Sequence, residues 1–200
     1  MRLPKIREII TAVKALITKP YTTKFPFRPH IPFKSFRGKP YFDKDKCVGC
    51  SACVNVCPTG ALSFKDIKTD SGFKRVLKIR WDICIECGQC QLNCLTSEGI
   101  VLSNEYDLSA TEERKSLFQE IEKALVCCEV CGKPVACIDH YRWVINKLGP
   151  LYVSNTSLIS FKQKEIFIAE TLPKSTPEIL RSDRFRILCP VCRREAVFTS

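Results

Sequence analysis

The sequence predicts an α+β fold, and three of its features carry that prediction. First, residues 45–102 contain one cysteine pattern twice, with an offset of 37 residues between the two copies. Second, two runs of alternating apolar and polar residues lie between the copies, which is typical of a β-hairpin. Third, apolar residues recur every three or four positions near the N-terminus and beyond residue 108, which indicates helices.

The 14 cysteines among the 200 residues decide the class of protein. Eight of them form two Cys-x2-Cys-x2-Cys-x3-Cys runs, and four more form two Cys-x2-Cys pairs. These spacings are typical of metal ligands, which are thiolates kept in a reducing compartment, so they exclude a disulfide scaffold. The sequence has neither a glycine-rich phosphate-binding loop nor a dinucleotide fingerprint, and its two histidines belong to no catalytic motif. We therefore expect an electron carrier without catalytic residues.

Each of the two longer runs is typical of a loop that binds a [4Fe-4S] cluster. The first three cysteines of such a run bind one cluster, and the fourth binds the cluster of the other run. This crossed ligation assigns to the first cluster Cys47, Cys50, Cys53 and Cys94. It assigns to the second cluster Cys84, Cys87, Cys90 and Cys57. Residues 45–108 are therefore predicted to form a two-cluster ferredoxin-like domain.

The predicted hairpin is inserted into this domain. Apolar and polar residues alternate in Ala61–Lys68 and in Phe73–Trp81. Residues 69–72 between them, Thr-Asp-Ser-Gly, are of the types that favour a tight turn. The two runs are therefore expected to pair as antiparallel strands between the two cluster loops.

Residues 1–44 are predicted to be an amphipathic helix followed by an extended arm. The helix covers residues 3–18, where the apolar residues form one stripe. The arm, residues 19–46, contains five prolines, which disfavour regular structure, and seven aromatic residues, which disordered linkers lack. We expect the helix to lie against a partner protein or a bilayer surface, and the arm to wrap over a neighbouring subunit. The alternative is that the helix caps the body of this protein.

Residues 109–200 are predicted to form a helical and ribbon-like region. A Ser-x-x-Glu capping box at Ser109 and Glu112 predicts a helix over Ser109–Leu125. A second helix is predicted from about Ile138 to Leu148, because a Gly-Pro pair follows and ends it. The best strand candidate beyond this helix is Glu165–Ala169.

The two Cys-x2-Cys pairs of this region predict a tetrahedral four-thiolate site of the rubredoxin or zinc-ribbon type. Its ligands are Cys128, Cys131, Cys189 and Cys192. Because Zn²⁺ and a single iron both accept four thiolates, the spacing does not separate them, and we favour zinc as a structural staple. Cys127 is an alternative to its neighbour as a ligand, whereas Cys137 is expected to be a buried apolar cysteine.

The net charge of +11 is concentrated at the N-terminus. Residues 1–46 carry +9, residues 47–108 carry −1 and residues 109–200 carry +3. Part of the excess is expected to offset the negative charge of metal–thiolate groups; the alternatives are a solvated basic tail and a nucleic-acid-binding protein. Paired cluster loops contribute nothing to nucleic-acid binding, so no nucleic-acid partner is expected. No apolar stretch reaches the roughly 20 residues of a membrane-spanning helix, and we expect no membrane crossing.

The sequence also resembles a known family. The resemblance is carried by the four C-terminal ligand cysteines and by Phe36–Pro40, Cys47–Pro58, Cys84–Cys90 and Glu105–Leu108. These segments are similar to the iron–sulfur relay subunit of respiratory complex I. They are closer still to the equivalent subunit of formate hydrogenlyase and related membrane-bound [NiFe] hydrogenases, since the complex I subunit usually lacks the C-terminal cysteine pairs.

This resemblance implies an electron-transfer subunit that relays electrons through two [4Fe-4S] clusters. It implies a peripheral position on the cytoplasmic face of the cell membrane, between an electron-donor iron–sulfur protein and the hydrogenase small subunit, within a membrane-bound complex of several subunits. Two alternatives are the relay subunit of a complex I-like oxidoreductase and a free ferredoxin. The arm and the C-terminal region argue against the free ferredoxin.

Overall fold

The structure is a computed structural model, and the residues that it describes are 5–18, 22–70, 72–109, 117–166 and 178–198. Contacts divide the chain into two compact units, Met1–Phe36 and Arg37–Ser200, which are described separately. Within the described ranges, no helix combines the length and the apolar character that a bilayer span requires.

The N-terminal unit contains helix α1 (Ile6–Ile17), which confirms the predicted amphipathic helix over its described part. The backbone N–H of Lys5 donates to the Glu8 carboxylate at 3.0 Å, and a carboxylate in the first turn is favoured by the helix dipole. None of the residues of α1 is buried, and Leu16 is 87% exposed. Residues 22–36 form turns and extended chain, as their prolines predict.

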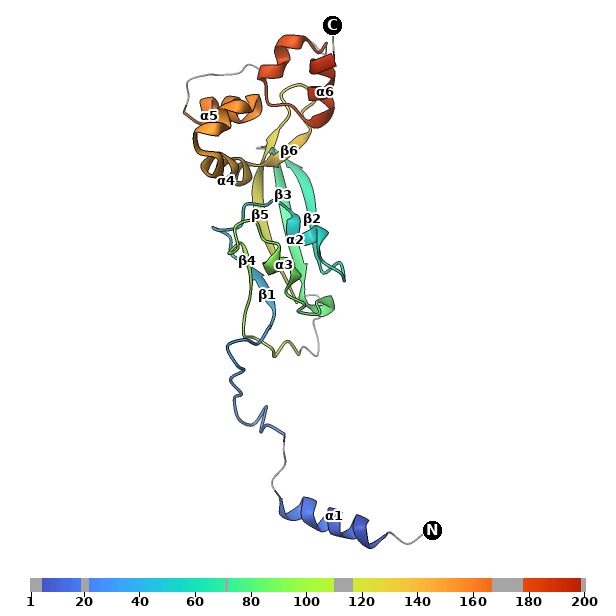
Figure 1. Cartoon of the computed structure of the whole chain (residues 1–200). Helices are drawn as coiled ribbons and strands as arrows, with labels where there is room; N and C mark the ends of the chain where they lie inside the picture. Colours follow the sequence, from blue (N-terminus) through green and yellow to red (C-terminus); the bar gives the residue numbers. More distant parts are fainter. Residues whose placement is uncertain (1–4, 19–21, 71, 110–116, 167–177, 199–200) are drawn as a thin grey trace. The chain divides into compact units, whose positions relative to one another are not determined.

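The larger unit is built on a four-stranded antiparallel sheet with the order β2-β3-β5-β6 (Figure 1). Strands β2 (Leu62–Thr69) and β3 (Gly72–Arg80) are the predicted hairpin, in a register that pairs Leu62 with Ile79. The sheet continues through β5 (Phe118–Cys127) to the short β6 (Pro134–Cys137). The hairpin prediction is therefore confirmed.

Strand β5 corrects the helix that we predicted over Ser109–Leu125. Its buried residues alternate with exposed ones, since Ile121, Lys123 and Leu125 are buried between more exposed neighbours. Apolar residues four positions apart lie on one side of a helix and also on one side of a strand, so the sequence pattern fits both. The segment becomes a strand because it pairs with the open edge of β3 over seven register positions. Residues 110–116, which include most of the predicted capping box, lie outside the described residues.

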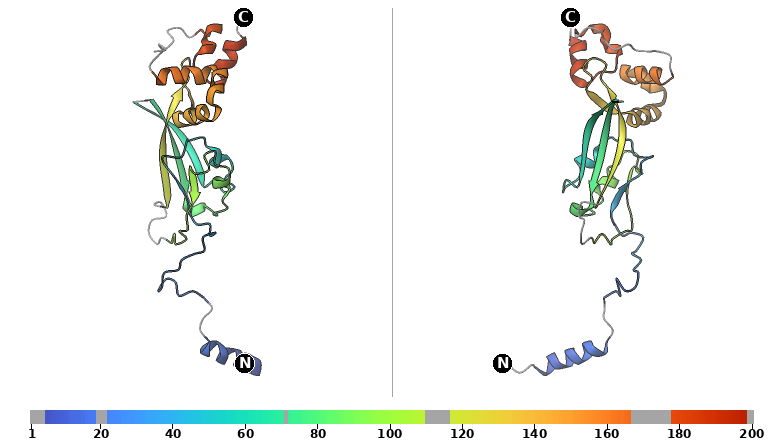
Figure 2. Two further views of the ribbon diagram at one scale, coloured as in Figure 1. Left: turned by 60° about the vertical axis from the view of Figure 1, so that its left-hand side comes forward. Right: turned by 180° about the vertical axis from the view of Figure 1, so that it is seen from behind.

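The two cysteine loops lie on one face of this sheet. Each loop leads into a short helix, α2 (Ala52–Asn55) or α3 (Gln89–Leu92), and Figure 2 shows both helices on the same side of the strands. Strands β1 (Pro40–Phe42) and β4 (Ile100–Leu102) pair with each other as a second small sheet. The core between these layers consists of Phe42, Leu62, Leu77, Ile79, Ile100 and Ile121, together with Cys53 and Cys90.

The C-terminal part is helical. Helix α4 spans Ile138–Leu148, as predicted, and α5 (Thr156–Glu165) follows, with the Asn155 side chain accepting hydrogen bonds at its N-terminus. Helix α6 (Pro190–Phe198) ends the described chain. The predicted strand Glu165–Ala169 is wrong where it is described, because Glu165 closes α5 and the next residue is a turn; residues 167–169 lie outside the described residues.

Candidate metal centres

The three thiols of the first loop lie close to Cys94. A Cβ built on Gly99 would be 3.0 Å from the Cα of Cys47 and 3.3 Å from the Sγ of Cys94, so this glycine lies between the two cysteines. Burial, and after it the neighbouring thiols of Cys47, Cys50, Cys90 and Cys94, together raise the pKa of Cys53 to about 12. The first loop therefore shares one electrostatic environment with the fourth cysteine of the other run.

The thiols of the second loop line a single pocket together with Cys57. The cysteines that line this pocket are Cys57, Cys84, Cys87 and Cys90. Burial, and after it the charges of the two other second-loop thiols, raise the pKa of Cys90 to about 11. Apolar residues such as Leu62 and Ile79 complete the wall. The fourth cysteine of the first run thus lies with the second loop.

Both quartets fit a positively charged metal cluster. In each quartet the buried thiol, Cys53 or Cys90, does not ionise readily, because burial and the neighbouring thiols raise its pKa. Hydrogen bonds outweigh burial at Cys94 and Cys57 and lower the pKa of these two thiols. Bound iron reverses the preference of the buried thiols, since a coordinated thiol is deprotonated by the metal. The donor set is therefore suited to a cluster and poorly suited to free thiolates.

The two loops also have the same backbone conformation at equivalent positions. Gly49 (φ 70°) and Ser51 (φ 64°) of the first loop correspond to Glu86 (φ 52°) and Gly88 (φ 80°) of the second, with the offset of 37 residues. A positive φ favours glycine, yet each loop has glycine at only one of its two positions. The sequence repeat is thus a structural repeat, and the non-glycine residues bear backbone strain that the loop shape requires.

The first loop is packed tightly against the C-terminal half of the larger unit. Its Gly49 carbonyl accepts hydrogen bonds from the Arg75 guanidinium at 3.1 Å and from the Cys137 thiol at 3.3 Å. Cys137 is fully buried, as predicted. A Cβ at Gly49 would be only 2.5 Å from the Cys137 Sγ, so a side chain has no space at this position. Sequence reasoning missed this contact because it joins residues 88 positions apart.

We expect Gly49→Ala to destabilise the protein and reduce occupancy of the first loop. The alanine would suffer left-handed strain of about 1–2 kcal/mol and, in addition, about 1–3 kcal/mol of overpacking against Cys137. Gly60→Ala is the matched control, because Gly60 also has a positive φ of 66° but nothing within 4 Å of its Cβ position. Chemical unfolding and iron analysis of both variants test this expectation. Equal losses in the two variants would contradict it.

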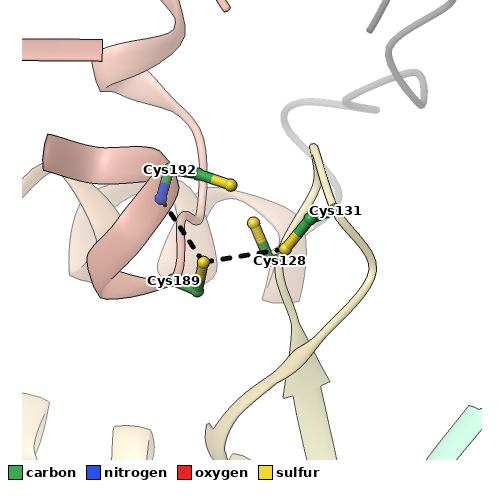
Figure 3. A group of neighbouring side chains, drawn as sticks. All are labelled: Cys128, Cys131, Cys189 and Cys192. Atoms are coloured by element: carbon green, nitrogen blue, oxygen red, sulfur yellow. Dashed lines mark hydrogen bonds between the residues drawn. The ribbon is translucent and has the colours of Figure 1, made fainter. Parts of the chain in front are cut away.

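The four C-terminal cysteines form a compact sulfur cluster (Figure 3). Their Sγ atoms all lie within 4.8 Å of one another, and they form the only such group of potential metal ligands among the residues that the structure describes. The sulfurs of Cys131 and Cys189 are 3.6 Å apart. Figure 3 shows the side chains converging from two segments of the chain. This arrangement brings together all four residues that the sequence predicted.

Two different structures present these four thiols. Cys128 and Cys131 lie in the turn between β5 and β6, which Gly132 closes with a φ of 69°. Cys189 and Cys192 lie at the start of helix α6 rather than in a second hairpin, so the second pair departs from the ribbon-like topology that we expected. Cys127 ends β5 opposite Pro134 and is not part of the group.

The electrostatics of this group favour a bound cation. Burial opposes ionisation of Cys128, but backbone hydrogen bonds from Cys131, Cys189 and Val130 outweigh it and lower its pKa to about 7. Burial and the adjacent thiols raise the pKa of Cys192. The Cys128 thiol is thus prepared for a metal, while Cys131 and Cys192, whose pKa values are raised, need the metal to ionise. This is the chemistry of a four-thiolate Zn²⁺ or iron site.

Comparison with known proteins identifies the family of the chain. Residues 46–97, which contain both cysteine runs, match the family described as 4Fe-4S dicluster domain. Formate hydrogenlyase subunit 6 of Escherichia coli (strain K12) is 37% identical over 132 residues, which cover 64% of this chain and 69% of that subunit. The chain belongs to the family of this subunit.

The formate hydrogenlyase subunit 6 family also has relatives among quinone oxidoreductases. The NAD(P)H-quinone oxidoreductase subunit I of Gloeobacter violaceus is 31% identical over 121 residues, which cover 58% of this chain and 57% of that subunit. The match thus spans little more than half of that relative's length. These relatives confirm the resemblance predicted from the sequence, and residues 46–97 confirm the 4Fe-4S domain.

The chain is also similar to chains of solved structures. One of these is described as the structure of the membrane-bound sulfane sulfur reductase, an archaeal respiratory membrane complex. The match covers 58% of this chain and 62% of that chain, with 26% identity and a TM-score of 0.41.

Proposed function

We propose that this chain is a non-catalytic electron-transfer subunit that holds two [4Fe-4S] clusters within a membrane-associated hydrogenase complex of the formate hydrogenlyase type. The observation that carries the proposal is the pair of thiol quartets, each of which combines three cysteines of one loop with the fourth of the other. The 37% identity to formate hydrogenlyase subunit 6 supports the choice of complex. Electrons would enter from an iron–sulfur protein and leave toward the hydrogenase small subunit.

In this proposal the first cluster is bound by Cys47, Cys50, Cys53 and Cys94, and the second by Cys84, Cys87, Cys90 and Cys57. When bound, such clusters supply one-electron redox chemistry at potentials that their surroundings tune. The residues of this chain hold the ligand loops in their left-handed conformation and keep water from the sites. Leu62, Leu77 and Ile79 do the latter, since each is at most 4% exposed beneath the loops.

The chain is proposed to act as three functional parts. Residues 1–44 would attach the subunit to its neighbours, residues 45–108 would carry the clusters, and residues 109–200 would hold one further metal, zinc or a single iron, at the four C-terminal cysteines. We favour zinc, because a closed four-thiolate site is typical of structural zinc. These functional parts do not coincide with the compact units, since β5 of the third part completes the sheet of the second.

A peripheral position on the cytoplasmic face of the membrane follows from the same proposal. The apolar stripe of α1 is exposed, with Ile10 at 61% and Ile17 at 79%. Full burial of such a side chain contributes about 1.5–3 kcal/mol, so the stripe is better covered by a membrane subunit than left in water. The lysines and arginines within positions 1–46 would also be attracted to an anionic membrane surface.

The second candidate is the relay subunit of a complex I-like oxidoreductase, which the 31% identity to the Gloeobacter subunit favours. Anaerobic affinity purification of the tagged full-length chain from its own cells separates the two. Recovery of a hydrogenase large subunit supports the hydrogenase complex, and recovery of quinone oxidoreductase subunits without hydrogenase supports the alternative. Iron analysis of the same sample tests the clusters themselves.

Deletion of residues 1–36 is expected to release the subunit from its membrane complex while both clusters stay assembled. The ligand cysteines all belong to the other compact unit, so cluster binding does not need the deleted segment. Membrane fractionation at increasing salt, with iron analysis of the released protein, is the measurement. Retention of the truncated chain on the membrane at high salt would contradict the anchoring role.

A pair of point variants sharpens this test. Ile10→Lys places a charge in the apolar stripe of α1, whereas Thr11→Lys adds the same charge to its polar side, where Thr11 bonds the Arg7 carbonyl. We expect the first variant to be released like the deletion and the second to remain bound. Equal behaviour of the two would mean that charge alone, and not the apolar stripe, governs attachment.

A further inference from the structure

Two cationic side chains lie next to each other beneath the first cluster loop. Arg75 of β3 and Lys123 of β5 are direct cross-strand partners in the sheet. Both lie on the face that also carries the buried Leu77 and Ile121, and their side chains are only 14% and 9% exposed. Like charges directly opposite each other destabilise a sheet, and burial increases that cost. An arrangement of this kind needs negative charge nearby.

Both cations donate hydrogen bonds to the first loop or to the residues just before it. The Lys123 ammonium donates to the Lys44 carbonyl at 2.6 Å, just ahead of Cys47, and its Cγ would lie 3.3 Å from a Cβ at Gly49. Arg75 donates to the Gly49 carbonyl and, at 3.3 Å, to the Ser51 hydroxyl. Burial raises the pKa of Cys47, and the Lys123 charge opposes that rise.

Each of the two cations also forms an ion pair, Arg75 with Asp66 and Lys123 with Asp139, while it keeps its contact with the loop segment. Asp66 of β2 is the cross-strand partner of Arg75 on the side away from β5, and it accepts two hydrogen bonds from the Arg75 guanidinium, of 2.8 and 2.9 Å. Asp139 accepts from Lys123 at 2.8 Å but is itself shared with Arg142 at 3.5 Å. Each cation is therefore held between its acid and a backbone carbonyl in or just before the first loop.

The Gly49 carbonyl also fixes the orientation of the peptide that follows it. Arg75 and the Cys137 thiol both donate to this oxygen. In a trans peptide the N–H points opposite to the carbonyl, so the N–H of Cys50 points away from both donors. The two donors thus polarise a peptide whose N–H belongs to a cluster ligand.

Among the residues that the structure describes, no buried cation comparable to Arg75 or Lys123 contacts the second loop. Its carbonyl contact comes from Arg37, which donates to the Cys87 oxygen at 3.1 Å from an exposed position. Where the first loop has Gly49, the second has Glu86, whose side chain carries a carboxyl group. The first loop therefore faces nearly buried cations, and the second faces an exposed cation and an acid.

From this contrast we infer that Lys123 and Arg75 are positioning residues that make the first cluster easier to reduce than the second. Reduction adds one electron, and thus one negative charge, to a cluster site, and no bond to the protein forms or breaks. A fixed cation in a half-buried place stabilises the reduced state more than an exposed one, which solvent screens. The inference rests on the proposed function, since it needs a cluster in each loop.

The test is a redox titration of the anaerobically purified full-length holoprotein, followed by electron paramagnetic resonance. Cys50→Ser, which keeps a possible oxygen ligand, identifies the signal of the first loop. Lys123→Met removes the charge and should shift the midpoint potential of that signal to more negative values. Asp139→Asn removes the opposing charge and should shift it to more positive values. Lys123→Arg keeps the charge and should leave it near the native value.

Lys78→Met is the matched control. Lys78 lies on the same sheet but on its other face, where it pairs with Glu120 at 2.7 Å, so its loss should move neither signal. A purely structural role for Lys123 would not give shifts of opposite sign from Lys123→Met and Asp139→Asn. Shifts of the same sign, or none, would overturn the inference. A native protein that contains no cluster would instead overturn the proposed function, which iron analysis shows separately.

Discussion

Replacement of Cys192 by serine is expected to unfold the chain beyond about residue 126 while both [4Fe-4S] clusters stay in place. The small core at the C-terminal metal site consists of three of its four cysteines, together with Leu188 and Ala196 as the buried apolar residues. Binding of structural zinc contributes about 10–16 kcal/mol of apparent free energy, far more than so small a core recovers by packing. Loss of one thiolate therefore removes much of the folding free energy of this region.

The clusters should survive because, apart from the Cys137 hydrogen bond to the Gly49 carbonyl, their support lies outside this region. Strand β5 pairs with β3 over seven register positions, from Arg80 to Lys74, and none of these contacts requires the metal. Metal analysis, limited proteolysis and the visible absorbance of the clusters are the measurements. We expect loss of the zinc, rapid cleavage within residues 128–198 and unchanged cluster absorbance.

Cys127→Ser is the matched control for this prediction. Cys127 is adjacent to a ligand, but its sulfur is not part of the four-thiol group. The variant should keep its metal and its resistance to proteolysis. Redox-active iron at the site, together with a Cys192→Ser protein that folds normally and transfers electrons slowly, would contradict the structural role and assign the site to electron transfer.

The elements that could be predicted from the sequence are those that local signals determine. The hairpin β2–β3 follows from alternation around a Ser-Gly turn, and α4 from its periodicity and the Gly149-Pro150 stop. Strand β5 could not be predicted in this way. Its apolar spacing of four fits a helix equally well, and the deciding contact is the edge of β3, whose paired residues lie 38 to 50 positions earlier in the chain.

The same division holds for the metal centres. The ligand cysteines could be predicted because cluster and zinc ligands follow fixed short spacings. The residues behind the first loop could not, because Arg75, Lys123 and Cys137 come from three separate elements and meet only in the folded sheet. A lysine between two buried apolar residues of β5 was the available signal, but it has meaning only once the segment is known to be a strand.

Replacement of Cys94 by alanine tests the crossed ligation and has the other large expected effect. Cys94 lies in the second cysteine run, but its sulfur is close to Cys47 across Gly99. If the fourth cysteine of each run binds the opposite cluster, the first loop keeps only three thiolates, and iron content should fall from about eight to about four per chain.

The mirror-image variant is Cys57→Ala, because Cys57 lines the pocket of the second-loop thiols. We expect Cys94→Ala to lose the signal that Cys50→Ser perturbs, and Cys57→Ala to keep that signal and lose the other. Both are measured by iron analysis and electron paramagnetic resonance of the anaerobically purified protein. The reverse pattern, in which Cys94→Ala spares the first-loop signal, would mean that each run binds its own cluster. In that case the two halves would be independent sites, and the proximity of Cys94 to the first loop would reflect packing alone.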